Sequence, residues 1–275
     1  MTTYGGKIKK REFSIYVLAI ILVYLVNIFM FFINVNNVSY PFKKDINCYS
    51  FWEYSTHNGI LTVFMFLLPI IISLITIKNI NTKIYGSYLR NYLIRDDYKK
   101  LIKKEYLSCL VKTITPYVII SILIFIFGFI FLKHDITNIK YADLYSNFIY
   151  DPMFSPPIVI LLETIISIIF FISLVNIELI IYRVIKKLGL TIIFSFVSIN
   201  VLNFITSYLF KIISPLINNK YISEALYSFN IYHGFIGTKY IMFTLVVFSL
   251  ICILSFILLK KMYSNKERMI LDFEQ

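Results

Sequence analysis

Six long apolar stretches constrain this chain more than any other feature, because a helix needs about 20 mostly apolar residues to cross a bilayer. The gaps between the stretches are short, and no polar segment is long enough to fold as a separate soluble domain. The sequence therefore predicts an all-α integral membrane protein, a single transmembrane domain over residues 1–275 with six spans. The expected spans are about 14–33, 60–77, 110–132, 157–182, 190–213 and 240–259.

Composition agrees with a lipid-embedded chain. Hydrophobic residues make up 59% of the sequence and charged residues only 15%, whereas a soluble domain carries about 25% charged residues.

Basic residues precede the first stretch, as in a signal peptide. Its apolar core is too long, however, and no small-residue cleavage site follows, so we expect it to be a retained helix.

The basic residues are distributed unevenly among the gaps. Of the 27 Lys and Arg residues, 20 lie before the first stretch, in the segment from Lys78 to Lys112, between the fourth and fifth stretches, and after the sixth. The positive-inside rule then places both termini in the cytoplasm. A nucleic-acid-binding protein would gather its positive charge on a soluble face, so we expect no nucleic-acid partner despite the net charge of +12.

No catalytic motif is recognisable in the sequence. His57, His134 and His233 lie in predicted outside gaps without metal-ligand spacing, and we interpret them as solvated or interfacial. The sequence lacks a G-x-S-x-G elbow and a P-loop. We therefore expect no enzymatic activity and no cofactor in this chain. If ATP drives transport here, another subunit must bind it.

Two ionisable residues fall inside predicted spans at similar depth. Glu163 lies about two turns into the fourth span, and Lys211 lies near the outer end of the fifth. A charge in hydrocarbon costs a few kcal/mol or more unless it is paired or hydrated. We expect both side chains to face the bundle interior and to pair, as a substrate-path or gating contact or as a structural ion pair. The alternative is a Lys211 that snorkels to the surface.

Other polar residues in the spans suit helix packing. Glu178 is expected to anchor the inner end of the fourth span by meeting Arg183 or a lysine of the gap between the second and third spans. Asn176, Asn200 and Asn203 can hydrogen-bond between helices, and the last two are three residues apart, hence on one face. We interpret all three as contacts that join helices.

The gap between the second and third stretches, at Ile80–Cys109, predicts an amphipathic cytoplasmic helix with a break near Arg95–Asp97. Its apolar residues recur at roughly helical spacing and charges fill most other positions; they are Leu89, Leu93, Ile94, Tyr98, Leu101 and Ile102. Such a helix either rests on anionic lipid or docks a cytoplasmic partner, and the two roles are compatible.

This order of elements resembles the permease subunits of bacterial ABC-2-type transporters. In that family a helical cytoplasmic loop joins spans two and three, and it often reads as a glycine, a helix and a basic stretch. Gly86, the helix from Leu89, and Lys103–Tyr106 follow that order. The gap at Pro215–Gly237 has the size and place of the family's short outer helix, which we expect over Tyr221–Phe235. The segment before the first span is shorter than in many members.

The resemblance implies a dimer, with a second permease copy or paralogue, in the bacterial cytoplasmic membrane. A separate ATPase subunit would hold ATP and Mg²⁺. Its docking site would be the coupling loop, with Tyr85, Gly86, Leu89, Leu93, Arg95, Asp96, Asp97 and Tyr98. The implied activity is export of an antimicrobial or amphipathic peptide, a lipid or a drug. The alternatives are a membrane immunity or sensor protein without an ATPase, and an intramembrane enzyme.

The coupling loop gives a first prediction. Replacing Arg95, Asp96 and Asp97 with Ala removes charges from a cytoplasmic segment, so membrane insertion should be intact. Stimulation of the ATPase partner should be abolished because the docking contact is lost. Normal co-purification and normal transport by the triple variant would contradict a coupling role for this loop.

Overall fold

The computed structural model describes residues 3–36, 47–57, 61–84, 98–134, 155–236 and 240–264, and these residues fold into helices and connecting turns. The long helices are α1 (Thr3–Asn36), α3 (Leu61–Ile84), α5 (Tyr98–Phe131), α6 (Pro156–Ile185), α7 (Leu188–Ile213) and α10 (Ile241–Tyr263). The short elements are α2 (Cys48–His57), η3 (Ser214–Leu216), α8 (Lys220–Ser228) and α9 (His233–Ile236).

Five of the long helices, α1, α5, α6, α7 and α10, are long and apolar enough to cross a membrane. The apolar part of α3 within the side chains that the structure describes, Phe66–Ile77, is shorter. The prediction of an all-α, membrane-embedded protein is therefore confirmed. A sixth span at α3 and the cytoplasmic placement of both termini remain predictions.

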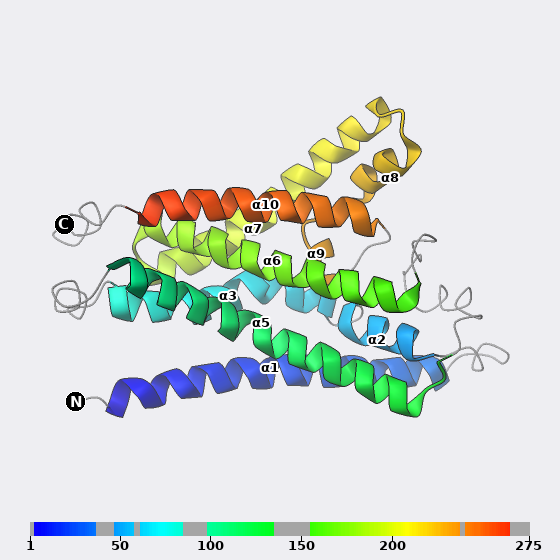
Figure 1. The fold of residues 1–275 in the computed structure, drawn as a ribbon, viewed down its shortest axis with the longest axis horizontal. Helices are drawn as coiled ribbons and strands as arrows, with labels where there is room; N and C mark the ends of the chain where they lie inside the picture. Colours follow the sequence, from blue (N-terminus) through cyan, green and yellow to red (C-terminus); the bar gives the residue numbers. More distant parts are fainter. Residues whose placement is uncertain are drawn as a thin grey trace.

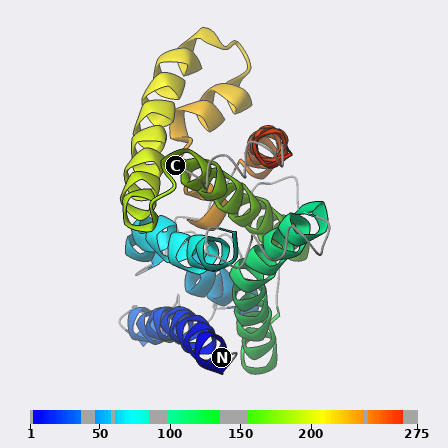
Figure 2. The same ribbon diagram turned by 90° about the vertical axis from the view of Figure 1, so that its left-hand side faces the viewer.

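Successive long helices run in opposite directions, as Figures 1 and 2 show. The starts of α1, α5 and α7 and the ends of α3, α6 and α10 lie at one end of the bundle, on the left in Figure 1. We call this the basic end, because α5 begins there and α10 ends there with exposed lysines. The opposite end is called the outer end, because the positive-inside rule predicts that it faces outward.

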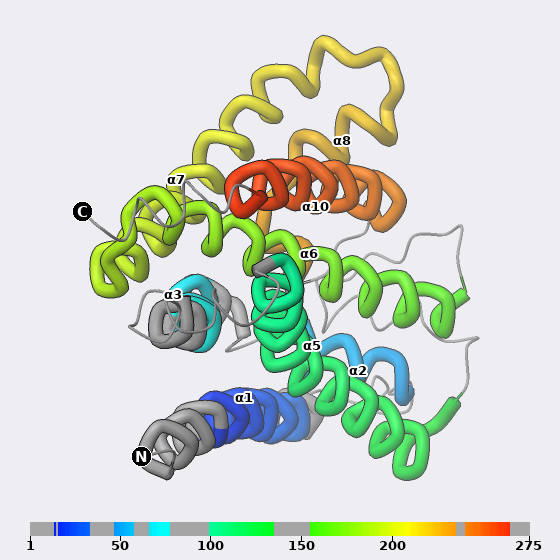
Figure 3. Tube along the Cα trace, turned by 60° about the vertical axis from the view of Figure 1, so that its left-hand side comes forward, coloured from blue at the N-terminus to red at the C-terminus, as the bar shows by residue number. Residues whose placement is uncertain are grey.

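Helix α6 is the centre of the bundle. Half of its length is buried, against 17–28% of the other four candidate spans, and it packs against α3, α5, α7 and α10. Figure 3 shows it between α10 on one side and α3 and α5 on the other. Its start at Pro156 fits the preference of proline for the first helical turn. Its end at Lys186, with φ 59°, is a left-handed cap whose N–H donates to the Tyr182 carbonyl.

Helices α3 and α5 contain Pro69 and Pro116 in their interiors. A proline inside a helix removes one backbone hydrogen bond and favours a kink, and Figure 2 shows that α5 changes direction along its length. Helix α5 also begins at Tyr98, earlier than the predicted span at 110. The basic segment Lys99–Lys104 is therefore continuous with the third span, since lysine is a good helix former.

Helix α2, in the gap between the first two predicted spans, is buried inside the bundle. The Trp52 indole donates to the Ser121 carbonyl of α5 at 3.1 Å, and the Asn27 amide of α1 donates to the Ser55 carbonyl at 3.3 Å. Gly128 of α5 lies so close that an added Cβ would be 2.8 Å from the Phe51 ring. These tryptophan and phenylalanine side chains fill the space between α1 and α5.

The gap between α7 and α10 also folds back on the molecule. The short helix expected over 221–235 is present as two pieces, α8 and α9. Helix α7 and α8 form a hairpin that projects away from the other helices (Figure 1). Helix α9 packs instead against the middle of α6, where a Cβ on Gly234 would lie only 2.6 Å from the Cβ atom of Phe170.

This contact predicts a difference between two glycines. Gly234→Ala should lower the free energy of unfolding by about 1–3 kcal/mol, because the new methyl group overlaps the root of the Phe170 side chain. The matched control is Gly189→Ala in the first turn of α7, where a Cβ meets no atom within 4 Å. Thermal unfolding of the detergent-purified variants measures both. Equal stability of the two variants would contradict the packing of α9 on α6.

Candidate functional site

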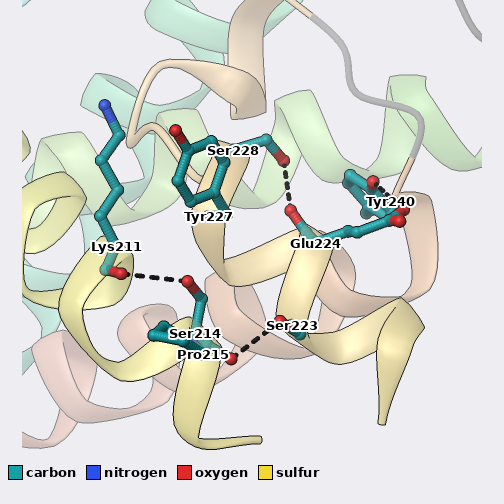
Figure 4. A pocket seen from close by; sticks show the side chains of 8 residues that line it. All are labelled: Lys211, Ser214, Pro215, Ser223, Glu224, Tyr227, Ser228 and Tyr240. Atoms are coloured by element: carbon teal, nitrogen blue, oxygen red, sulfur yellow. Dashed lines mark hydrogen bonds between the residues drawn. The ribbon is translucent and has the colours of Figure 1, made fainter.

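A cavity at the outer end is the first candidate site. It has a volume of about 580 Å³ and lies where α7, η3, α8 and the start of α10 meet (Figure 4). We call it the outer cavity. Its lining residues are Lys211, Ser214, Pro215, Ser223, Glu224, Tyr227, Ser228 and Tyr240.

The outer cavity combines a cation, a carboxylate and two aromatic rings. The Lys211 ammonium lies 5.8 Å from the centroid of the Tyr227 ring, within the range of a cation–π interaction. The Tyr240 hydroxyl donates to Glu224 Oε2 at 2.9 Å (Figure 4), and Ser223 Oγ donates to the Ser214 carbonyl at 2.8 Å. Such a lining suits an amphipathic molecule with a charged group, since polar groups orient a ligand and aromatic faces bury it.

The predicted contact between Glu163 and Lys211 is wrong. Lys211 is exposed and extends over Tyr227 of α8, because the outer half of α7 leaves the bundle with α8 (Figure 1). Glu163 is buried in α6, one turn from Ser167, whose hydroxyl accepts from Tyr117 of α5 at 2.9 Å. Glu163 therefore faces the bundle interior, as predicted, but toward α5 and not toward Lys211.

Glu178 also has a different environment from the predicted one. Its carboxylate is fully buried and accepts from the Thr76 hydroxyl of α3 at 3.4 Å. Arg183 turns away and lies over the ring of Tyr263 of α10, 6.0 Å from its centroid. Glu178 is thus part of the interface between α3 and α6. Its predicted contact with Arg183 is corrected, and the predicted contact with a lysine stays a prediction, because the side chains of Lys78 and Lys83 lie outside the described residues.

Asn176 joins three helices through one side chain. The Tyr106 hydroxyl of α5 donates to Asn176 Oδ1 at 2.8 Å, and Asn176 Nδ2 donates to Ser255 Oγ of α10 at 3.1 Å. The amide is fully buried, so both of its ends are satisfied inside the bundle. This confirms the interpretation of Asn176 as a helix-joining residue. We call Tyr106, Asn176 and Ser255 the central network.

Asn200 and Asn203 hold the segment before α9 against α7. Asn200 Oδ1 accepts from the Tyr232 hydroxyl and Asn203 Oδ1 accepts from the Ile231 backbone N–H, both at 2.8 Å. Their predicted position on one face of the helix is confirmed, because both face the same short segment. Their partner is a returning loop and not another long helix.

The histidines occupy three different environments. His134 is exposed and stacks on Phe129 at 4.1 Å. His57 is buried beside Trp52, with its Nδ1 2.7 Å from the Thr56 hydroxyl, so the interpretation of this residue as solvated or interfacial is wrong. Burial lowers the pKa of His57 to about 3 and that of His233 to about 4, which keeps both rings neutral near pH 7. Within the described residues, no group of three His, Cys, Asp or Glu side chains could hold a metal ion.

Most of the predicted coupling loop, namely Tyr85, Gly86, Leu89, Leu93, Arg95, Asp96 and Asp97, lies outside the described residues. Tyr98 is the first residue of α5. The third span is therefore reached directly from the coupling loop, with no turn between Tyr98 and Phe131.

Comparison with known proteins gave no match: no family model, no curated protein and no solved structure is similar to this chain.

The central network generates a test of helix joining. Tyr106→Phe and Ser255→Ala each remove one hydrogen bond of Asn176, and each should lower the free energy of unfolding by about 0.6–1.7 kcal/mol. Tyr208→Phe is the control, since Tyr208 is exposed on α7 and the same hydroxyl is removed. Unfolding in detergent followed by circular dichroism measures the three variants. If Tyr106→Phe is no less stable than Tyr208→Phe, the network does not hold the helices.

Proposed function

We propose that this chain is the membrane-spanning permease subunit of an ATP-driven exporter, in the bacterial cytoplasmic membrane, and that a separate ATPase subunit powers it. The observation that carries the proposal is the segment between α7 and α10. It contains two short helices, of which α8 pairs with the end of α7 and α9 packs against the middle of α6. The resemblance to ABC-2-type permeases implies a short outer element at this place.

The central network supports a route for mechanical coupling. A partner that docks on the loop ending at Tyr98 would act directly on α5, which is one helix from Tyr98 to Phe131. Tyr106 lies two turns into that helix and is hydrogen-bonded to Asn176 of α6, which is bonded to Ser255 of α10. A displacement of α5 would therefore reach α6 and α10 through a continuous chain of hydrogen bonds, which is one physical route for coupling between distant sites.

The outer cavity supports an amphipathic cargo. Its Lys211, Glu224, Tyr227 and Tyr240 side chains offer both charge signs and aromatic faces at the end of the molecule away from the coupling loop. An antimicrobial peptide, a lipid or a drug that leaves the bundle there would meet groups that suit it. The transporter would work as a dimer with a second copy or a paralogue, and ATP and Mg²⁺ would be held by the ATPase.

A tagged pull-down from mild detergent tests the proposal. The expected result is a stoichiometric soluble ATPase with a P-loop, identified by mass spectrometry. A chain that is purified alone, also in the presence of ATP and lipid, would contradict the permease and favour a sensor or immunity protein without an ATPase.

The control for this pull-down is a substitution at the opposite end of the molecule. Lys220→Ala changes an exposed charge at the start of α8 and should leave the recovery of the ATPase unchanged. Loss of the ATPase in this variant would place the docking surface at the outer end and contradict the coupling route.

A further inference from the structure

A second cavity lies at the basic end, between α5 and α10. Its volume is about 580 Å³, within the roughly 300–1,000 Å³ range of small-molecule sites. We call it the basic-end groove. Helices α5 and α10 both pack on α6, and Leu179 of α6 lies in the lining between them.

One part of the groove is lined by apolar side chains of both helices. Ile102 and Leu107 of α5 line one wall, and Phe256 and Leu259 of α10 line the other. Tyr106 and Phe256 approach each other across the groove, with ring centroids 6.2 Å apart. The Tyr106 hydroxyl is held by Asn176, which joins the groove to the central network.

Three lysines from two helices line the same groove. Lys99 and Lys103 come from the first turns of α5, and Lys260 comes from the last turn of α10. Glu105 is the carboxylate in the described lining, and it is buried. The side chains of Lys103 and Lys260 are exposed. The groove is therefore apolar inside and predominantly cationic at its rim.

We propose that the basic-end groove binds an anionic phospholipid. The phosphate would lie between Lys103 of α5 and Lys260 of α10, and an acyl chain would lie against Leu107 and Phe256. Basic pockets between transmembrane helices at one membrane surface bind anionic lipid head groups for the same reason, since the lysines and the negative surface attract each other. This site is independent of the proposed export function and of any ATPase.

Charge and exposure favour a lipid over a second copy of this chain. A twofold contact through the groove would bring the Lys99, Lys103 and Lys260 side chains of two copies together, and like charges at close range repel. Leu107 and Phe256 are 47% and 46% exposed, so the apolar part of the groove is accessible to an acyl chain. One phospholipid molecule carries a phosphate that can bind the lysines and an acyl chain that can cover the apolar side chains.

The consequence is a lipid that bridges α5 and α10 next to the central network. Because Tyr106 belongs both to the groove lining and to the network, the bound lipid would stabilise the arrangement of these two helices around α6. Anionic lipid should therefore raise the unfolding temperature of the protein more than zwitterionic lipid does.

The test is lipid binding by the delipidated full-length protein, measured by native mass spectrometry with dioleoyl phosphatidylglycerol or dioleoyl phosphatidylcholine. The wild-type protein should hold one phosphatidylglycerol at least about tenfold more tightly than phosphatidylcholine. The double variant Lys103→Gln/Lys260→Gln should bind phosphatidylglycerol about tenfold or more weakly, since each basic residue near a membrane surface adds about a factor of five. Equal binding of the two lipids by the wild-type protein would overturn the proposal.

The matched control is Lys104→Gln/Lys261→Gln, which removes the same charge from neighbouring exposed positions that do not line the groove. It should retain phosphatidylglycerol, and so should Lys103→Arg/Lys260→Arg, which keeps the charges. If both glutamine variants lose the lipid equally, the attraction is diffuse and the groove is not the site. If Lys103→Gln/Lys260→Gln binds like the wild type, or changes only the oligomeric state, the groove has another occupant and the proposal fails. The unfolding temperature of each variant in detergent alone checks its folding.

Discussion

The need to satisfy polar groups away from water determines this structure. Hydrocarbon offers no hydrogen-bond partner, so a chain inside it must form helices and turn its polar side chains toward one another. Helix α6 carries more of these side chains than any other described helix, and its partners come from several neighbours. Asn176 bonds to α5 and α10, and Glu178 bonds to α3. The position of α6 at the centre follows from this distribution, because a helix with polar residues on several faces can be satisfied only when it is surrounded.

The same constraint explains the two segments that enter the bundle from the outer end. Helix α2 contributes the Trp52 indole to a carbonyl of α5, and the segment before α9 contributes the Tyr232 hydroxyl and the Ile231 N–H to α7. These bonds join the short segments to a carbonyl of α5 and to two asparagine side chains of α7. The long helices and the short segments therefore depend on each other, and the outer cavity exists because α7 and α8 leave this arrangement together.

The sequence predicted the long helices well because apolar length is a one-dimensional signal. It located α6 and α7 within a few residues. The sequence did not predict how each helix is rotated about its own axis. Glu163 and Lys211 lie at similar depth, but depth does not reveal which neighbour a side chain faces, and α7 diverges from α6 where Lys211 lies.

The burial of α2 was also missed, because Trp52 and Tyr54 are residue types that equally favour a membrane surface. Thr76 gave no signal in an apolar stretch and Tyr106 gave none in a basic one, although their hydroxyls join helices.

The central claim is that ATP hydrolysis on a partner acts on α5 and spreads through Asn176 to α6 and α10. The most direct measurement is the rate of ATP hydrolysis by the partner ATPase in proteoliposomes, alone, with the wild-type chain and with Asn176→Leu. The account predicts that the wild-type chain stimulates hydrolysis and that Asn176→Leu still binds the ATPase but stimulates it much less. An identical rate with and without the wild-type chain would contradict the account.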